Sequence, residues 1–144
     1  MELRNKLYRI KDKQWDGHTG SYLLSLNPKC VIYQAHFPGE PITPGVCIVQ
    51  MGKEVLEDAT GMKMEIASVK NVKFLSIISP EDSQEITYLL NKVEWEGMPG
   101  LSGAETSCKD AEGQDLRRLK ALITVMAGDK AKAKISFTLR RWIK

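Results

Sequence analysis

Histidine and cysteine are scarce in this chain, and long apolar runs are absent. The 144 residues include two histidines and three cysteines, and no apolar run approaches the ~18 residues of a membrane-spanning helix. Cys30, Cys47 and Cys108 are far apart and odd in number, which argues against a disulfide framework and against a zinc site. The first residues are charged and lead into no apolar segment, so we expect no secretory signal and a cytoplasmic location.

The charge is modest and gives no reason to expect a nucleic-acid partner. The formal net charge is +3, and the chain lacks a CxxC pair, a P-loop and the aromatic motifs of RNA-binding domains. Residues 129–144 are the exception, with six Lys or Arg and one Asp. We interpret this run as the solvated face of a strand, with an acidic partner as the alternative.

The apolar pattern predicts a single domain in which most elements are strands. Residues 5–16 alternate loosely and fit either a first strand or a short helix, while 22–26 and 30–33 have the composition of strands. After a helix the pattern returns to strands at 67–79, 84–95, 119–127 and 131–140, and the last alternates cleanly between apolar and polar residues. Residues 97–117 have four glycines and little periodicity, so we expect a long loop or insertion there.

The helix is predicted from about Pro44 to Ala59, with Thr60-Gly61 as its end. One side of its helical wheel is apolar and the other is polar, with Val46 among the polar positions. The apolar side has Ile48, Val49, Gly52, Val55, Leu56 and Ala59; the polar side has Gln50, Lys53, Glu54, Glu57 and Asp58. We therefore expect an α+β fold in which one antiparallel sheet wraps around one long helix, covering even the polar side near Val46.

A stretch rich in proline and glycine leads into this helix. His36 is followed within nine residues by three prolines and two glycines, the last of them Gly45. Such a loop is stiff, and the helix that follows begins with N–H groups that have no partner within the helix. A base beside such donors suits a substrate that develops negative charge on oxygen.

The eleven residues His-Phe-Pro-Gly-x-Pro-x-x-Pro-Gly-Val, from His36 to Val46, resemble the signature of the bacterial 3-hydroxyacyl-[acyl-carrier-protein] dehydratases of fatty acid synthesis. A weaker likeness continues through residues 69–75 and ends at Ser79-Pro80. The resemblance covers residues 20–95 and resumes in the last two strands. It implies a single hotdog domain over residues 1–144, and a lyase that converts a 3-hydroxyacyl thioester to the trans-2-enoyl form.

The resemblance also implies roles for individual residues. His36 would take the C2 proton, and the N–H of Gly45, with Val46 beside it, would bind the thioester carbonyl. The acid that protonates the leaving hydroxyl would stand fourteen residues after the histidine, in the site shared by two subunits of a dimer or of a larger oligomer built from dimers. The substrate would arrive on the phosphopantetheine arm of acyl carrier protein or coenzyme A, so no further cofactor is expected.

The chain departs from the family at that acid position, which is Gln50. An amide has no proton to give at neutral pH, and general acid catalysis is typically worth ~10²–10⁴-fold. Glu54 lies one turn later and is the alternative acid, although its charged neighbours predict a solvated side chain; a water held by Gln50 could also deliver the proton. Two other functions stay open: a non-catalytic acyl-thioester-binding or partner subunit, and a hotdog acyl thioesterase.

Overall fold

The computed structural model describes residues 2–35, 39–96 and 117–142. The described chain forms two helices and six strands: β1 (Tyr8–Trp15), β2 (Gly20–Leu26), α1 (Val31–Ala35), α2 (Gly45–Thr60), β3 (Met64–Phe74), β4 (Glu85–Glu96), β5 (Arg118–Ala127) and β6 (Lys130–Arg141). No helix in these ranges is long and apolar enough to cross a bilayer.

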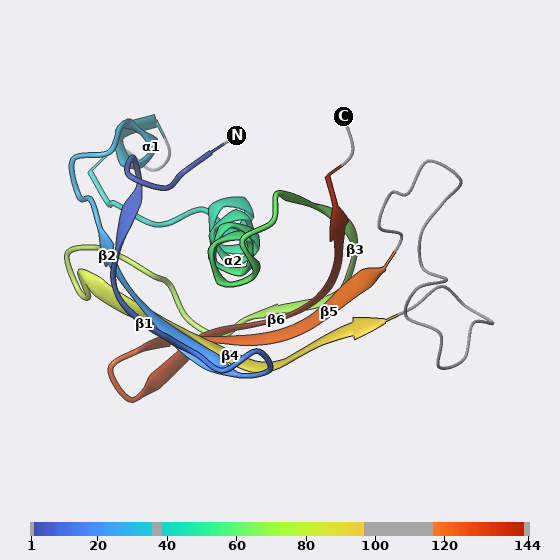
Figure 1. Ribbon diagram of the computed structural model, residues 1–144. Helices are drawn as coiled ribbons and strands as arrows, with labels where there is room; N and C mark the ends of the chain where they lie inside the picture. The colour runs from blue at the N-terminus through green and yellow to red at the C-terminus, as the bar shows by residue number, and fades with distance from the viewer. Residues whose placement is uncertain (1, 36–38, 97–116, 143–144) are drawn as a thin grey trace.

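The six strands form one sheet in the order β1-β2-β4-β5-β6-β3, with every neighbouring pair antiparallel. Figure 1 shows this sheet curling around α2, with the edge strands β1 and β3 rising on opposite sides of the helix. This is the hotdog arrangement, so the predicted α+β fold is confirmed.

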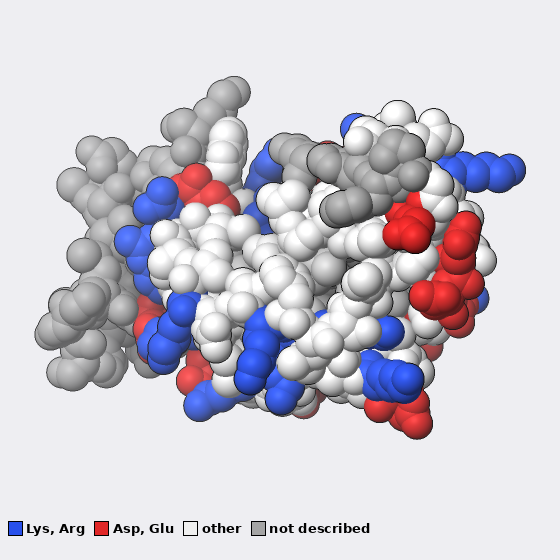
Figure 2. Space-filling view, turned by 180° about the vertical axis from the view of Figure 1, so that it is seen from behind, with Lys and Arg blue, Asp and Glu red and all other residues white. Residues whose placement is uncertain are grey.

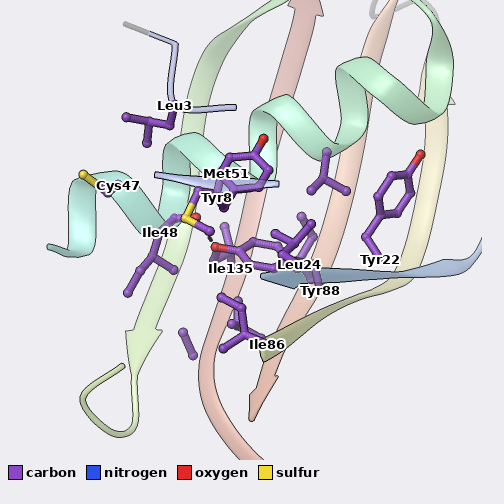
Figure 3. Packing of buried hydrophobic residues seen from close by; sticks show 14 of the residues in the cluster. Leu3, Tyr8, Tyr22, Leu24, Cys47, Ile48, Met51, Ile86, Tyr88 and Ile135 are labelled. Carbon is purple, nitrogen blue, oxygen red and sulfur yellow. Dashed lines mark hydrogen bonds between the residues drawn. The ribbon is translucent and has the colours of Figure 1, made fainter. Parts of the chain in front are cut away.

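The core lies between α2 and the concave face of the sheet. Met51, Val55 and Leu56 are fully buried along the helix, and Tyr88 and Ile135 meet them from the strands (Figure 3). Gly52 allows the close approach of helix and sheet, because a Cβ there would lie 3.3 Å from Ile123 and 3.5 Å from Phe137. Met51, which is on neither the apolar nor the polar side of the helical wheel given above, also belongs to the core, since it is fully buried.

Both ends of α2 lie close to where the sequence predicts them. Pro44 occupies the N-cap position with extended backbone angles, and it supplies no side-chain hydrogen bond to the first turn. Gly61 ends the helix at φ 72°, in the left-handed region that favours glycine, and its N–H donates to the carbonyl of Glu57.

Two sequence predictions need correction. Residues 30–33 are not a strand: Cys30 N–H donates to the Asn27 carbonyl and Tyr33 N–H to the Cys30 carbonyl, so the chain after Pro28 winds into α1. The β-branched pair Val31-Ile32 favoured a strand, but Val31 is 70% exposed and none of the described strands pairs with this segment. The strand predicted over 67–79 is β3, which starts and ends earlier, at Met64 and Phe74.

The remaining strand predictions agree with β2, β4, β5 and β6 to within a few residues, and the loosely alternating 5–16 segment is β1. In β6, Ala133, Ile135, Phe137 and Leu139 are buried, as the alternation predicts. Nearly all of the predicted loop at 97–117 lies outside the described residues.

Candidate functional site

The loop that bears the histidine motif is bounded on both sides by buried polar contacts. His36 itself, with residues 37 and 38, lies outside the described residues. Before the loop, the hydroxyl of Tyr33 in α1 is 2.9 Å from the hydroxyl of Thr43, which lies near the end of the loop. Thr43 N–H also donates to the Ile78 carbonyl. Both ends of the loop are thus tied to each other and to the segment that follows β3.

The first turn of α2 combines backbone donors with an apolar wall. Gly45 is the first residue of the helix, and the Phe74 ring lies so close that a Cβ on Gly45 would be 2.8 Å from the ring's Cζ. Val46 is 69% exposed and Phe74 is 51% exposed. In the single chain, therefore, the sheet does not cover the polar side of the helix at Val46, contrary to expectation.

The buried side of this turn is fixed to the sheet. Tyr88 donates a hydrogen bond of 2.7 Å from its hydroxyl to the Ile48 carbonyl. Cys47 is 4% exposed, and burial raises the pKa of its thiol, so this cysteine is a packing residue and not a reactive thiolate. Burial likewise raises the pKa of Tyr33 to about 12, against the lowering effect of its bond to Thr43.

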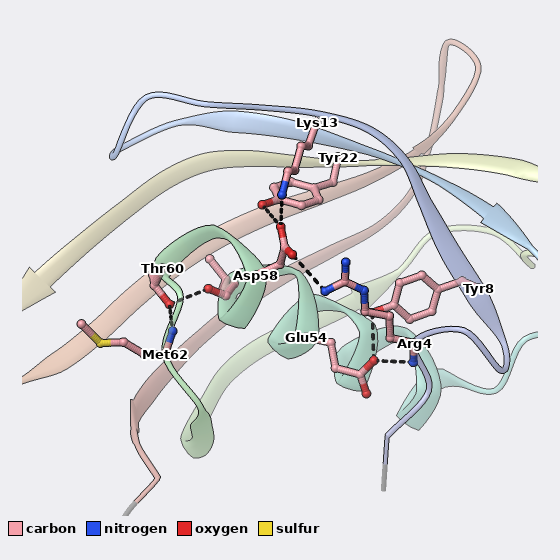
Figure 4. A network of polar contacts seen from close by, with 9 residues as sticks. Arg4, Tyr8, Lys13, Tyr22, Glu54, Asp58, Thr60 and Met62 are labelled. Carbon is pink, nitrogen blue, oxygen red and sulfur yellow. Dashed lines mark hydrogen bonds and ion pairs between the residues drawn. The ribbon is translucent and has the colours of Figure 1, made fainter.

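Gln50 and Glu54 face each other one helical turn apart. Gln50 Nε2 donates to Glu54 Oε2 at 2.8 Å. Glu54 is 5% exposed, so the interpretation of this residue as a solvated member of the polar side is wrong. Its carboxylate also accepts a bond from the backbone N–H of Leu3 at 2.8 Å. The backbone N–H of Arg4 and the Tyr8 hydroxyl donate to it as well, each at 2.8 Å (Figure 4).

Asp58, one turn further along α2, is a second anchor. It accepts bonds from Arg4 and Lys13, at 2.9 Å each, and from the Tyr22 hydroxyl at 2.7 Å (Figure 4). Burial opposes ionisation of Asp58, but the bonds from Lys13, Tyr22 and Arg4 outweigh it and hold the pKa of the carboxyl below its usual value. The N-terminal segment and β1 are thereby fastened to the helix at two successive turns.

A groove of about 510 Å³ runs between α2 and the start of β3. Its walls include Gln50 and Glu54 and, further along, Lys53, Glu57 and Trp142. The ammonium group of Lys63 lies 5.4 Å from the centre of the Trp142 ring. Gln50, which is half-buried, therefore stands where a bound molecule could reach its side chain.

The family model of the ApeI-like proteins, described as ApeI dehydratase, matches residues 12–98. The chain belongs to the ApeI-like dehydratase family. The matched region contains β2, α2, β3 and β4 together with the whole His36–Val46 motif, Gln50 and Glu54. The resemblance drawn from the motif is thus confirmed at the level of the family.

Curated relatives of this ApeI-like chain include 3-hydroxyacyl-[acyl-carrier-protein] dehydratases named FabZ. That of Latilactobacillus sakei is 31% identical over 70 residues, which are 44% of this chain and 50% of the relative. That of Haemophilus influenzae is 28% identical over 112 residues, 69% of this chain and 74% of the relative. The chain thus spans about half the length of the first of these relatives.

Solved structures with the same fold include the dehydratase heterocomplex ApeI:P from Xenorhabdus doucetiae. The likeness has a TM-score of 0.60 at 19% identity, and it covers 93% of this chain and 98% of the other. A mutant thioesterase from Pseudomonas aeruginosa gives a TM-score of 0.50 at 12% identity, over 92% of this chain and 78% of the other. At such low identities these two likenesses show the hotdog fold alone.

Sequence reasoning missed two parts of this site. It found neither the burial of Glu54 nor the contribution of the N-terminal segment. The donors to Glu54 include two backbone N–H groups some fifty residues away, and no residue pattern encodes them. Of the predicted site residues, the structure brings Gln50 and Glu54 together and places Gly45 and Val46 in the first turn of the same helix.

Proposed function

We propose that this chain acts on 3-hydroxyacyl thioesters and dehydrates them to trans-2-enoyl thioesters. The observation that carries the proposal is the match of the ApeI-like dehydratase model across the motif and α2. The named activity of the FabZ relatives supports it. The exposed first turn of α2 adds a chemical reason, since its donors lie beside an apolar wall.

In this mechanism His36 removes a proton from C2 of the substrate. The negative charge then spreads onto the thioester oxygen, which accepts a hydrogen bond from Gly45 N–H at the positive end of the α2 dipole, next to Val46. The electron pair of the C2–H bond forms the C2–C3 double bond as the C3–O bond breaks. The departing hydroxide takes up one proton and leaves as water.

The source of that last proton is the unusual part of the site. Gln50 stands at the acid position but has no proton to give at neutral pH. Glu54 is occupied as an acceptor of four hydrogen bonds, an arrangement that favours anchoring over proton donation. We therefore assign the proton to a water molecule held by Gln50. The hydroxide that this water becomes is neutralised through solvent by the proton that His36 took from C2, so one water is formed in total. We expect dehydration to be slow relative to a site with a carboxylic acid at position 50.

The substrate and the assembly belong to the same proposal. The acyl group would be carried by the phosphopantetheine arm of acyl carrier protein or coenzyme A in the cytoplasm, with no other cofactor. For an acidic carrier, the exposed residues Lys70, Lys73, Arg140 and Arg141 are the candidate contacts. On the face shown in Figure 2, Lys and Arg stand in separate groups between acidic and uncharged residues, so a docking site would be local.

A homodimer would cover the apolar residues that one chain leaves exposed. Val46, Val69, Phe74 and Ile77 are each 48% exposed or more, and they lie on the first turn of α2 or on and just after the edge strand β3. Among the described strands, β3 is paired with β6 alone, so its outer edge can accept a second copy. Light scattering should then give a mass of twice 16.2 kDa, or a multiple of that dimer.

The test is the interconversion of a short 3-hydroxyacyl-[acyl-carrier-protein] and its enoyl partner. We expect slow turnover by the parent protein, loss of turnover in His36→Ala, and a gain of ~10²-fold or more in Gln50→Glu. Glu57→Gln, which changes a carboxylate of the same groove, serves as the control. Turnover that survives His36→Ala would contradict the proposed role of the histidine.

A second candidate is a non-catalytic subunit that binds the acyl thioester or partners an active dehydratase. Gln50 favours it, because the acid is missing from the expected position, and ApeI of Xenorhabdus doucetiae is a dehydratase found in a heterocomplex. A silent parent together with an active Gln50→Glu would support this candidate. A thioesterase would need a carboxylate to activate water. This alternative has less support, because Glu54, the carboxylate beside Gln50, is buried and anchored.

A further inference from the structure

We propose that Glu54 is a positioning residue, which turns the Gln50 amide so that its nitrogen faces Glu54 and its carbonyl oxygen faces the site. The N-terminal segment Leu3–Tyr8 in turn holds Glu54 in place. That Gln50 meets the substrate rests on the proposed function; the orientation of its amide rests on geometry alone.

The carboxylate of Glu54 has a full set of partners. Leu3 N–H and Gln50 Nε2 donate to Oε2, while Arg4 N–H and the Tyr8 hydroxyl donate to Oε1. An ionised carboxylate offers about four acceptor sites, so the four donors use all of them. A protonated carboxyl would have to direct its own hydrogen at one of these donors.

This arrangement determines which end of the Gln50 amide faces Glu54. Backbone N–H groups can only donate, so Leu3 and Arg4 require Glu54 to accept. A carboxylate that only accepts selects the nitrogen end of the amide. The carbonyl oxygen is bonded to the same carbon and is directed away, and it accepts hydrogen bonds through its two lone pairs.

Burial makes the arrangement rigid. Leu3 is 2% exposed, Tyr8 is 1% exposed and Glu54 is 5% exposed, so water cannot readily replace the lost partner of any of them. Burial, reinforced by the Glu54 charge, raises the pKa of Tyr8 well above its ordinary value and keeps its hydroxyl a donor. The segment before β1 is therefore a support of the site.

The consequence for chemistry is that position 50 presents an acceptor to the substrate. The Gln50 carbonyl oxygen would accept a hydrogen bond from the 3-hydroxyl or from a water beside it. A water that donates one hydrogen to Gln50 has its second hydrogen available for the leaving hydroxide. This geometry agrees with the water-mediated proton that we assign to the reaction.

The direct test follows the side-chain amide resonances of Gln50 in ¹⁵N-labelled full-length protein. We expect Glu54→Gln to shift both Gln50 side-chain resonances and to speed their hydrogen exchange at least tenfold. Glu57→Gln removes a carboxylate one turn away and should leave them in place, since Glu57 pairs with Lys53 and Met64 N–H instead. Equal spectra for these two variants would overturn the inference.

Tyr8→Phe provides a second test in case Glu54→Gln does not fold. It removes one donor and leaves Glu54 in the chain, so a smaller displacement of the same resonances is expected. Unchanged Gln50 resonances in both Tyr8→Phe and Glu54→Gln would count against the inference. These spectra need no substrate, so they decide the inference even if the parent protein proves inactive.

A kinetic test adds a readout that a merely structural role would not change. In an active protein, Glu54→Gln should lower kcat by ~10- to ~100-fold with little change in KM, because a misplaced Gln50 holds the hydroxyl poorly in the transition state. A uniform loss of soluble protein with unchanged kcat would show a structural role only.

Discussion

The two tyrosines that bind carboxylates of α2 offer a matched pair for measuring how the site is anchored. Tyr8 donates to Glu54 at 2.8 Å and Tyr22 donates to Asp58 at 2.7 Å, and each is 1% exposed. The acceptors differ in their surroundings. Glu54 is 5% exposed, whereas the Asp58 side chain, at 11%, also has two cationic partners, Arg4 and Lys13.

We expect Tyr8→Phe to be the more destabilising substitution. A hydrogen bond to a charged group contributes ~1.5–3 kcal/mol, and a carboxylate that loses a donor in a closed site cannot recover it from water. Asp58 keeps two cations and some access to solvent, so Tyr22→Phe should lower the free energy of unfolding by ~0.5–1.5 kcal/mol. The ring of each residue stays in the core, so neither change leaves a cavity.

Urea unfolding of the parent and both variants measures the difference. The midpoints should fall in the order parent, Tyr22→Phe, Tyr8→Phe with an unchanged slope, since the surface exposed on unfolding is the same. Equal losses, or a larger loss in Tyr22→Phe, would refute the conclusion that the Glu54 contacts are the stronger anchor of the N-terminal segment.

Three further predictions follow from other contacts. Folding raises the pKa values of all four tyrosines, Tyr8, Tyr22, Tyr33 and Tyr88, so the stability that they contribute is present below pH ~10 and is lost as the pH rises above it. Tyrosinate absorbance should therefore rise only as the protein unfolds, and a rise in the folded protein near pH ~10 would contradict the burial of these side chains. The pKa of Asp58 is lowered by folding, so the stability that its ionised carboxylate contributes is lost as the pH falls through and below ~4. Asp58→Asn should therefore reduce the dependence of the free energy of unfolding on pH in the acid range, and an unchanged dependence would show that the partners of Asp58 do not stabilise the fold. Gly45→Ala should leave the free energy of unfolding nearly unchanged in the parent, and raise it by up to ~1 kcal/mol in Phe74→Ala, where the ring no longer contacts the new Cβ. A double-mutant cycle measured by thermal unfolding gives the coupling between the two positions, and a coupling of zero would refute the contact.

The sequence predicts those parts of the fold in which residues at a regular spacing are buried on the same face of a helix or strand, or in which one residue type favours a particular backbone angle. Alternation in β6 and the apolar side of α2 each reflect burial on one face, and Gly61 marks a backbone angle that glycine favours. The prediction for residues 30–33 was wrong because their β-branched side chains fit a strand, whereas the hydrogen bonds of the turn after Pro28 lead the backbone into α1.

The site was predictable where the motif is local and unpredictable where it is not. Gly45, Val46 and Gln50 follow from their spacing after His36 in the sequence. The setting of Glu54 depends on backbone groups of Leu3 and Arg4, which any residue except proline could supply at those positions. From residue types alone, therefore, Glu54 was predicted to be a solvated side chain.

The buried carboxylate of Glu54 determines which side chain position 50 can hold without loss of stability. The dependence of stability on pH in a Gln50 variant can test this. In Gln50→Glu, two carboxyl groups would meet at about the present 2.8 Å, next to a Glu54 still held by Leu3, Arg4 and Tyr8. Lys53 and Lys63 line the same groove, and the guanidinium of Arg4 is bonded to Asp58. Tyr88 and Cys47 interact electrostatically with Glu54, and both are neutral at pH 7 because their pKa values are raised. Like charges so close share one proton, which raises the pKa of the new carboxyl above its unfolded value of ~4.3.

A group whose pKa is raised by folding stabilises the fold below its unfolded pKa and loses that contribution as pH rises. Gln50→Glu should therefore be close to the parent in stability at pH 4 and clearly less stable at pH 8, by urea unfolding at both values. Gln50→Glu/Glu54→Gln removes the like-charged neighbour and should lose this pH dependence. If the single and the double variant behaved alike between pH 4 and 8, then Glu54 would not govern position 50, and the glutamine there would need another explanation.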